Sequence, residues 1–146
     1  DMSFNFYKLA RACLYFQKNV NCRFFAANSD ITDKLGTFFI PGNGPALLSV
    51  QASISLIPGV VHKEPIIVGK PNPLFAQLVL HRSNLTHIKP ERILVIGDRM
   101  DTDIALAKNC GFKSCLVLSG CTSESELQNF PKPSLPDFLL SGLSCF

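Results

Sequence analysis

The sequence predicts an α/β fold in which short parallel strands alternate with helices. Apolar runs at 66–68, 93–96 and 114–118 are separated by helix-length segments and short polar loops. Runs of β-branched and large aliphatic residues are typical of strands that are buried on both faces of a parallel sheet. Because strands and helices alternate with short connections, we expect right-handed crossovers and a layered domain.

The first 60 residues predict a helix, a strand and a second helix. From Phe4 to Gln17, apolar side chains recur at intervals of three and four residues, which is the pattern of an amphipathic helix. The apolar run Cys22–Ala27 predicts a strand. Ile40–Pro45 combines proline and glycine as turns do, so a helix should follow it and end near Ser55.

The rest of the chain predicts strands and helices in alternation. We expect strands at Ile66–Val68, Ile93–Ile96, Ser114–Leu118 and Asp137–Leu140, helices at Pro73–His81 and Thr102–Asn109, and a helical turn at Ser123–Gln128. Pro73 suits the first turn of a helix, where its missing N–H costs nothing. Ser123 followed by Glu126 fits a capping box.

Carboxylates gather where the strand at Ile93–Ile96 ends. Asp98 follows Gly97 directly, and Asp101 and Asp103 come shortly after it. The carboxyl ends of parallel strands open the ligand crevice of such a sheet, and Mg²⁺ prefers carboxylate oxygens. Alternatively, the acids only cap and charge the next helix, which contributes about 0.3–1 kcal/mol. Since Asp98 precedes the helix proper, we favour a metal site.

Lys70 is expected to lie near these acids. It stands between Gly69 and Pro71, which constrain the backbone, and just before the helix that Pro73 opens. One strand–helix–strand crossover separates it from Asp98, so both can reach the same edge of the sheet. A surface lysine without a role is the alternative, and the flanking glycine and proline favour the functional interpretation.

At these positions the sequence resembles the haloacid dehalogenase superfamily of phosphatases. Gly69-Lys-Pro71 and Val95-Ile-Gly-Asp-Arg-Met-Asp-Thr-Asp103 resemble its third and fourth motifs. The resemblance is closest to the branch of 4-nitrophenyl phosphatase, phosphoglycolate phosphatase and pyridoxal phosphatase. It extends over nearly the whole chain through Phe4–Ala12, Phe24–Asp30, Pro41–Gly44, Asn109–Gly111, Leu116–Gly120 and Pro136–Asp137.

The resemblance implies a Mg²⁺-dependent hydrolase of phosphate monoesters that forms an aspartyl-phosphate intermediate. Asp98 would bind the metal, Lys70 would neutralise the nucleophile and the transferring phosphoryl oxygens, and Asp103 would orient the metal site or Lys70. We also expect Asn28, Asp30 and Gly69 to contact the substrate, a small phosphorylated metabolite.

The resemblance further implies the fold of a partial enzyme. Residues 1–62 would be the remnant of an α/β cap domain, and residues 63–146 would be the C-terminal half of the Rossmann-like parallel-sheet core. The nucleophile motif of the family, Asp-x-Asp-Gly behind an apolar strand, is absent, because Asp101-Thr-Asp103 is the only Asp-x-Asp here and belongs to the fourth motif.

Three functions therefore stay open. The chain can be part of a phosphatase of this branch, and by itself it would then be inactive. It can also be a truncated, catalytically inactive product that acts as a binding or regulatory module. The third alternative is another doubly wound protein with acids at a strand end, such as a phosphoacceptor domain.

Composition excludes several other classes. The chain of 146 residues is 47% hydrophobic, but it has no apolar run long enough to cross a bilayer and begins without a signal peptide, so we expect a cytoplasmic location. A net charge of +3 without a basic stripe argues against nucleic-acid binding. The six cysteines form no Cys-x-x-Cys, and the three histidines share no metal-ligand spacing. The resemblance implies that the strand at Ile93–Ile96 pairs with a nucleophile-bearing strand that is absent here, so we expect that the chain can form a homodimer through this edge.

Overall fold

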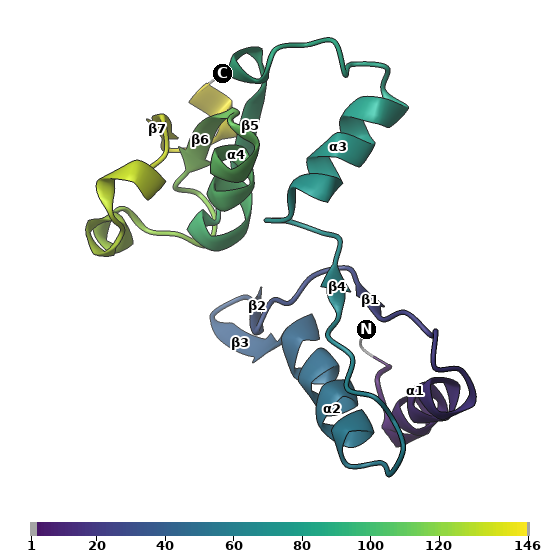
Figure 1. Cartoon of the computed structure of the whole chain (residues 1–146). Coiled ribbons are helices and arrows are strands. Elements are labelled where there is room, and N and C mark those ends of the chain that lie inside the picture. The colour runs from purple at the N-terminus through teal and green to yellow at the C-terminus, as the bar shows by residue number, and fades with distance from the viewer. Residues whose placement is uncertain (1–2, 146) are drawn as a thin grey trace. The chain divides into compact units, whose positions relative to one another are not determined.

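Three parallel strands near the C-terminus form one sheet of the molecule. They are β5 (Leu94–Gly97), β6 (Lys113–Val117) and β7 (Phe138–Leu140), in the order β5–β6–β7 (Figure 1). The structure is a computed structural model that describes residues 3–145, without the side chains of Lys34 and Cys145. All three carboxyl ends point to the same edge, where loops can assemble a site.

The segment after β5 enters its helix through a wide turn. Met100–Ile104 is a π-helix and continues into α4 (Ala105–Cys110), which ends at Gly111 with a φ of 69°. Met100, Ile104 and Leu116 are buried together and form the core of this part of the chain. Single π-turns occur often at functional sites, and this one contains Asp101 and Asp103.

The helix α3 (Pro73–Arg82) precedes this sheet in the chain. The side chain of Asn72 caps it by accepting from the N–H of Leu74 at 2.9 Å, and Pro73 occupies the first turn. Four short 3₁₀ helices complete the region at Pro90–Arg92, Glu124–Asn129, Lys132–Ser134 and Leu143–Cys145. The expected capping contact is present, because the N–H of Ser123 donates to the Glu126 carboxylate at 2.7 Å.

The N-terminal part has its own core between two helices. The helices are α1 (Phe6–Lys18) and α2 (Asn43–Ser55). Cys13 and Phe16 from α1 pack against Val50 and Ile54 from α2. Two small sheets accompany them: a parallel pair of β1 (Phe25–Ala26) and β4 (Ile66–Ile67), and an antiparallel hairpin of β2 (Thr32–Leu35) and β3 (Phe38–Pro41).

Two expectations about strands were wrong. The strand at Ile66–Ile67 does not join the sheet of β5, because its backbone pairs with Phe25–Ala26 instead. The hairpin at 32–41 was not expected. Its turn is made by Gly36 with a φ of 62°, a left-handed conformation that glycine adopts without a Cβ penalty.

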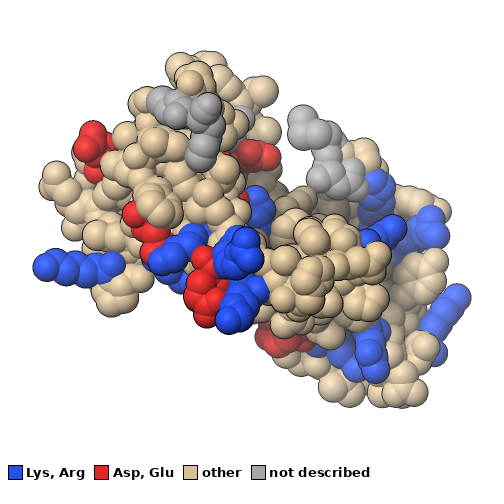
Figure 2. Space-filling view, turned by 90° about the horizontal axis from the view of Figure 1, so that it is seen from above, with Lys and Arg blue, Asp and Glu red and all other residues tan. Residues whose placement is uncertain are grey.

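The chain divides into two compact units, one ending at Val68 and the other beginning at Gly69. The expected division into a cap remnant and a hydrolase core concerns a longer enzyme and stays a prediction. Among the described residues, no helix is both long and apolar enough to cross a membrane. In Figure 2, acidic side chains lie next to several of the basic ones.

Asp137 ties the start of β7 to β6 through a network of hydrogen bonds and an ion pair. Its Oδ2 accepts from the N–H of Ser114 at 3.0 Å and from the Ser114 hydroxyl at 2.6 Å, and it forms an ion pair with Lys108 at 3.1 Å. Ser114 is completely buried. The hydrogen bond from the Ser114 hydroxyl lowers the pKa of Asp137 to about 2. Burial acts in the opposite direction, and Lys108 adds to the lowering.

We therefore expect Asp137→Asn to lower the free energy of unfolding by about 1 kcal/mol at pH 7, because solvent screens the charge of a partly exposed carboxylate. Because the pKa of Asp137 is depressed in the folded state, its contribution is present above pH about 4 and is lost as the pH falls toward 2. Urea denaturation at pH 7 and at pH about 2.5 checks this. The difference between wild type and variant should shrink by more than half at the lower pH, and a constant difference would contradict the assignment.

Candidate active site

The candidate site lies where β5 ends, and it is built on a close contact between Gly97 and Asp103. Asp103 is 5% exposed. A Cβ on Gly97 would collide with the Cβ, Cγ and Oδ2 atoms of Asp103. Because glycine has no Cβ, position 97 leaves room for the Asp103 carboxylate against the backbone at the end of β5.

Both oxygens of Asp103 have partners. Oδ1 accepts from Nζ of Lys70 at 2.5 Å, and Oδ2 accepts from the backbone N–H groups of Asp98 and Arg99 at 3.2 Å each. A buried carboxylate needs such partners, because an unpaired one would pay the full cost of desolvation. Asp103 thus contacts both the lysine and the loop that carries Asp98, and its role as an orienting residue stays a prediction.

Lys70 reaches this point from the start of the second unit. Its side chain is 43% exposed, so its charge is paired with Asp103 and still accessible to a ligand. Gly69 lies beside it and accepts from the N–H of Asn72 at 2.9 Å. The side-chain amide of Asn109 donates to the carbonyl of Pro71 at 3.0 Å and ties this loop to α4.

Asp98 is half-buried at the carboxyl end of β5. Its Oδ2 accepts from the N–H of Cys121 at 2.8 Å. Burial acts to raise the pKa of Asp98, but hydrogen bonds from the Cys121 N–H and thiol and the charge of Arg99 outweigh it, so the pKa lies below its ordinary value. The carboxylate is therefore ionised at neutral pH, which is the form that binds metal.

Asp101 points away from this arrangement and pairs with Arg99. The guanidinium donates from Nε at 3.0 Å and from one terminal nitrogen at 2.7 Å. These bonds to Arg99 are the main reason why the pKa of Asp101 is lowered. Its side chain is 61% exposed.

A magnesium ion suits the donors at this edge. Mg²⁺ keeps several waters and takes one or two carboxylates together with substrate phosphate oxygens, and Asp98 offers one ionised carboxylate. Among the described residues, no group of three or more His, Cys, Asp or Glu side chains could enclose a metal ion. Asp98 therefore fits as one ligand, and a complete site needs further donors.

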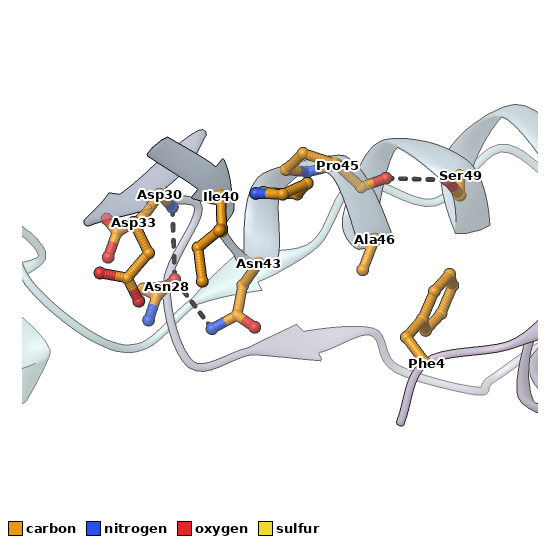
Figure 3. A pocket seen from close by; sticks show the side chains of 11 residues that line it. Phe4, Asn28, Asp30, Asp33, Ile40, Asn43, Pro45, Ala46 and Ser49 are labelled. Atoms are coloured by element: carbon orange, nitrogen blue, oxygen red, sulfur yellow. Dashed lines mark hydrogen bonds between the residues drawn. The ribbon is translucent and has the colours of Figure 1, made fainter. Parts of the chain in front are cut away.

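The two candidate substrate residues of the first unit lie at a separate pocket of about 360 Å³. The carboxamide oxygen of Asn28 accepts from the N–H of Asp30 at 3.3 Å and from the amide of Asn43 at 3.1 Å (Figure 3). The carbonyl of Asp30 accepts from the N–H of Gly44 at 2.8 Å. These contacts fix the turn into α2, and substrate binding by Asn28 and Asp30 stays a prediction.

The structure thus brings Gly69, Lys70, Asp98 and Asp103 to one edge of the second unit. The sequence analysis did not identify two neighbours of Asp98, namely Gly120 and the backbone of Cys121. The position of Gly120 in the sequence could have identified this loop. Gly120 follows the strand of β6, which pairs in parallel with β5, so its loop opens at the same edge as Asp98.

Comparisons with known proteins give one family match and several similar sequences. Residues 67–144 match the family model described as HAD-hydrolase-like. Chloroplastic phosphoglycolate phosphatase 1A of Arabidopsis thaliana is 33% identical over 146 residues, which are 100% of this chain and 38% of that protein. The chain spans less than half the length of such curated relatives.

Two solved structures are similar to this chain over nearly its whole length. A 4-nitrophenylphosphatase from Thermotoga maritima superposes with a TM-score of 0.80 and 29% identity, over 98% of this chain and 50% of that one. A glycerol phosphate phosphatase from Mycobacterium tuberculosis, in complex with magnesium, gives a TM-score of 0.78 and 26% identity, over 99% of this chain and 40% of that one.

Proposed function

Because the chain belongs to the HAD-hydrolase-like family, we propose that it supplies the metal- and lysine-bearing part of a Mg²⁺-dependent phosphatase. The substrate would be a phosphate monoester of a small metabolite, with phosphoglycolate and 4-nitrophenyl phosphate as the first compounds to assay. The observation that carries the proposal is the contact of Lys70 with buried Asp103, which also binds the loop of Asp98.

In this proposal Lys70, Asp103 and Asp98 together stabilise the negative charge of the phosphoryl group. Lys70 would place a cation beside the anionic phosphoryl group, and Asp103 would hold that cation through Oδ1. Asp98 would bind Mg²⁺, which, when bound, polarises the phosphoryl oxygens and neutralises their charge. The nucleophilic aspartate would come from another part of a longer chain that includes these 146 residues, here called the complete enzyme.

The chemistry would proceed in two displacements. The carboxylate of the nucleophile would attack phosphorus, and the alcohol of the ester would leave with a proton from a neighbouring acid. Water would then cleave the aspartyl-phosphate and release inorganic phosphate. The cap remnant at 1–62, the core half at 63–146 and a cytoplasmic location remain parts of the proposal.

The test compares Asp98→Asn with Asp101→Asn in the complete enzyme. We expect Asp98→Asn to raise the Mg²⁺ concentration for half-maximal hydrolysis of 4-nitrophenyl phosphate at least about tenfold, because a ligand is lost. Asp101→Asn should stay close to wild type, because this side chain is exposed and paired with Arg99. Equal effects of the two substitutions would contradict the assignment of the metal ligand.

The alternative is an inactive binding or regulatory module. The intact mass of the protein isolated from cells distinguishes the two. A stable product of the length of these 146 residues alone would favour the module, and a product of about the length of the relatives would favour the enzyme.

A further inference from the structure

The loop after β6 holds Asp98 at two points. The N–H of Thr122 donates to the carbonyl of Asp98 at 3.0 Å, and the N–H of Cys121 donates to its Oδ2 at 2.8 Å. These bonds fix both the backbone and the carboxylate of a residue that sits at the end of a different strand. A carboxylate held by a charge-assisted bond to a rigid loop loses much of its rotational freedom.

Gly120 makes this contact possible. A Cβ at position 120 would lie 2.5 Å from Cγ of Asp98 and still closer to its Cβ and Oδ2. Carbon atoms do not approach so closely, so an alanine there would displace the carboxylate or the loop. Either movement would weaken the bond between the Cys121 N–H and Oδ2.

We propose that Gly120 and the backbone N–H of Cys121 position Asp98 for metal binding. The bond from the Cys121 N–H holds the carboxylate through Oδ2, and this fixes the direction in which Asp98 can present its oxygens to the ion. This inference rests on the proposed function and adds a positioning element that lies outside the motifs carrying Lys70 and Asp98. Groups that orient a metal ligand commonly affect metal affinity by about 10- to 100-fold.

A purely structural role for Gly120 makes a different prediction. Gly120 is exposed and its φ lies outside the left-handed region, so the strain from an alanine there comes from its contact with Asp98. Gly142 is buried but has room for a Cβ, and it provides the control. A Cβ at Gly142 would meet only the side chains of Ser119 and Ser144, at 3.6 Å or more, which is ordinary van der Waals contact.

The experiment measures Mg²⁺ binding to the complete enzyme by isothermal titration calorimetry, with the Tm without metal recorded for each variant. We expect Gly120→Ala to weaken Mg²⁺ binding at least about tenfold with only a small fall in the metal-free Tm, and Gly142→Ala to match wild type. Raising the Mg²⁺ concentration should restore most of the activity of Gly120→Ala, because the other catalytic groups remain in place.

Three results would overturn the inference or separate it from the proposed function. Wild-type affinity in Gly120→Ala would show that the loop does not position Asp98. A large fall in its metal-free Tm would show that Gly120 serves the fold instead. If the wild-type enzyme itself neither bound Mg²⁺ nor hydrolysed phosphate esters, the proposed function would fail, whatever Gly120→Ala did.

Discussion

Replacing Lys70 with Met in the complete enzyme should lower kcat by at least about a hundredfold, as the loss of one preorganised charge does. Nζ of Lys70 is held by the buried carboxylate of Asp103, so its position is fixed before the substrate arrives. A charge that is held in advance stabilises the transition state without reorganisation. Steady-state kinetics with 4-nitrophenyl phosphate at saturating Mg²⁺ measures the effect.

Lys132→Met serves as the control for this substitution. Lys132 is exposed at the start of a 3₁₀ helix, and its loss removes the same charge from the same unit. It should leave kcat unchanged. If Lys70→Met kept a normal kcat and raised only KM, Lys70 would merely attract the substrate, and its role in the transition state would be wrong.

The 146-residue chain by itself should hydrolyse no phosphate ester and should associate. Within the described residues, β5 pairs with β6 on one side only. Side chains of β5 also line a hollow of about 340 Å³, together with mainly apolar side chains of α3 and α4. Leu94 and Ile96 are each 41% exposed. An apolar edge with unpaired backbone groups is a template for pairing with another chain.

Substitutions on the two edge strands of this sheet, β5 and β7, test whether the chain associates through β5. Leu94 on β5 and Leu139 on β7 are equally exposed, at 41% each. Lysine on an edge strand opposes pairing, so Leu94→Lys should lower the association measured by sedimentation velocity. Leu139→Lys should have a smaller effect, because β7 is shorter than β5 and presents fewer unpaired backbone groups at its edge. The reverse order would contradict pairing through β5.

The alternation of strands and helices was predictable because each element carries its own signal. The apolar runs at 93–96 and 114–118 became β5 and β6, and proline, glycine and asparagine marked the ends of α2, α3 and α4. The resemblance to the superfamily is confirmed by the family match. The expected proximity of Lys70 and Asp103 is also present.

Other features depend on contacts that the sequence does not display. The hairpin at 32–41 has neither alternating polarity nor a strong turn pair around Gly36, so its register comes from pairing alone. The π-turn at Met100–Ile104 adds a residue to a helical turn, which no apolar period reveals. Gly120 and Asp98 lie after two neighbouring strands, β6 and β5. They are far apart in the sequence, and only the pairing of these strands brings them together.

The phosphatase activity of the purified 146-residue chain tests the central claim most directly. We predict no Mg²⁺-dependent release of 4-nitrophenol from the chain alone, and activity when a separately produced N-terminal part of the complete enzyme is added, because that part would bring the nucleophile. A well-folded monomer of these 146 residues that hydrolyses 4-nitrophenyl phosphate with Mg²⁺ would contradict the account. The nucleophile would then have to be sought among Asp30, Asp33 and Asp101.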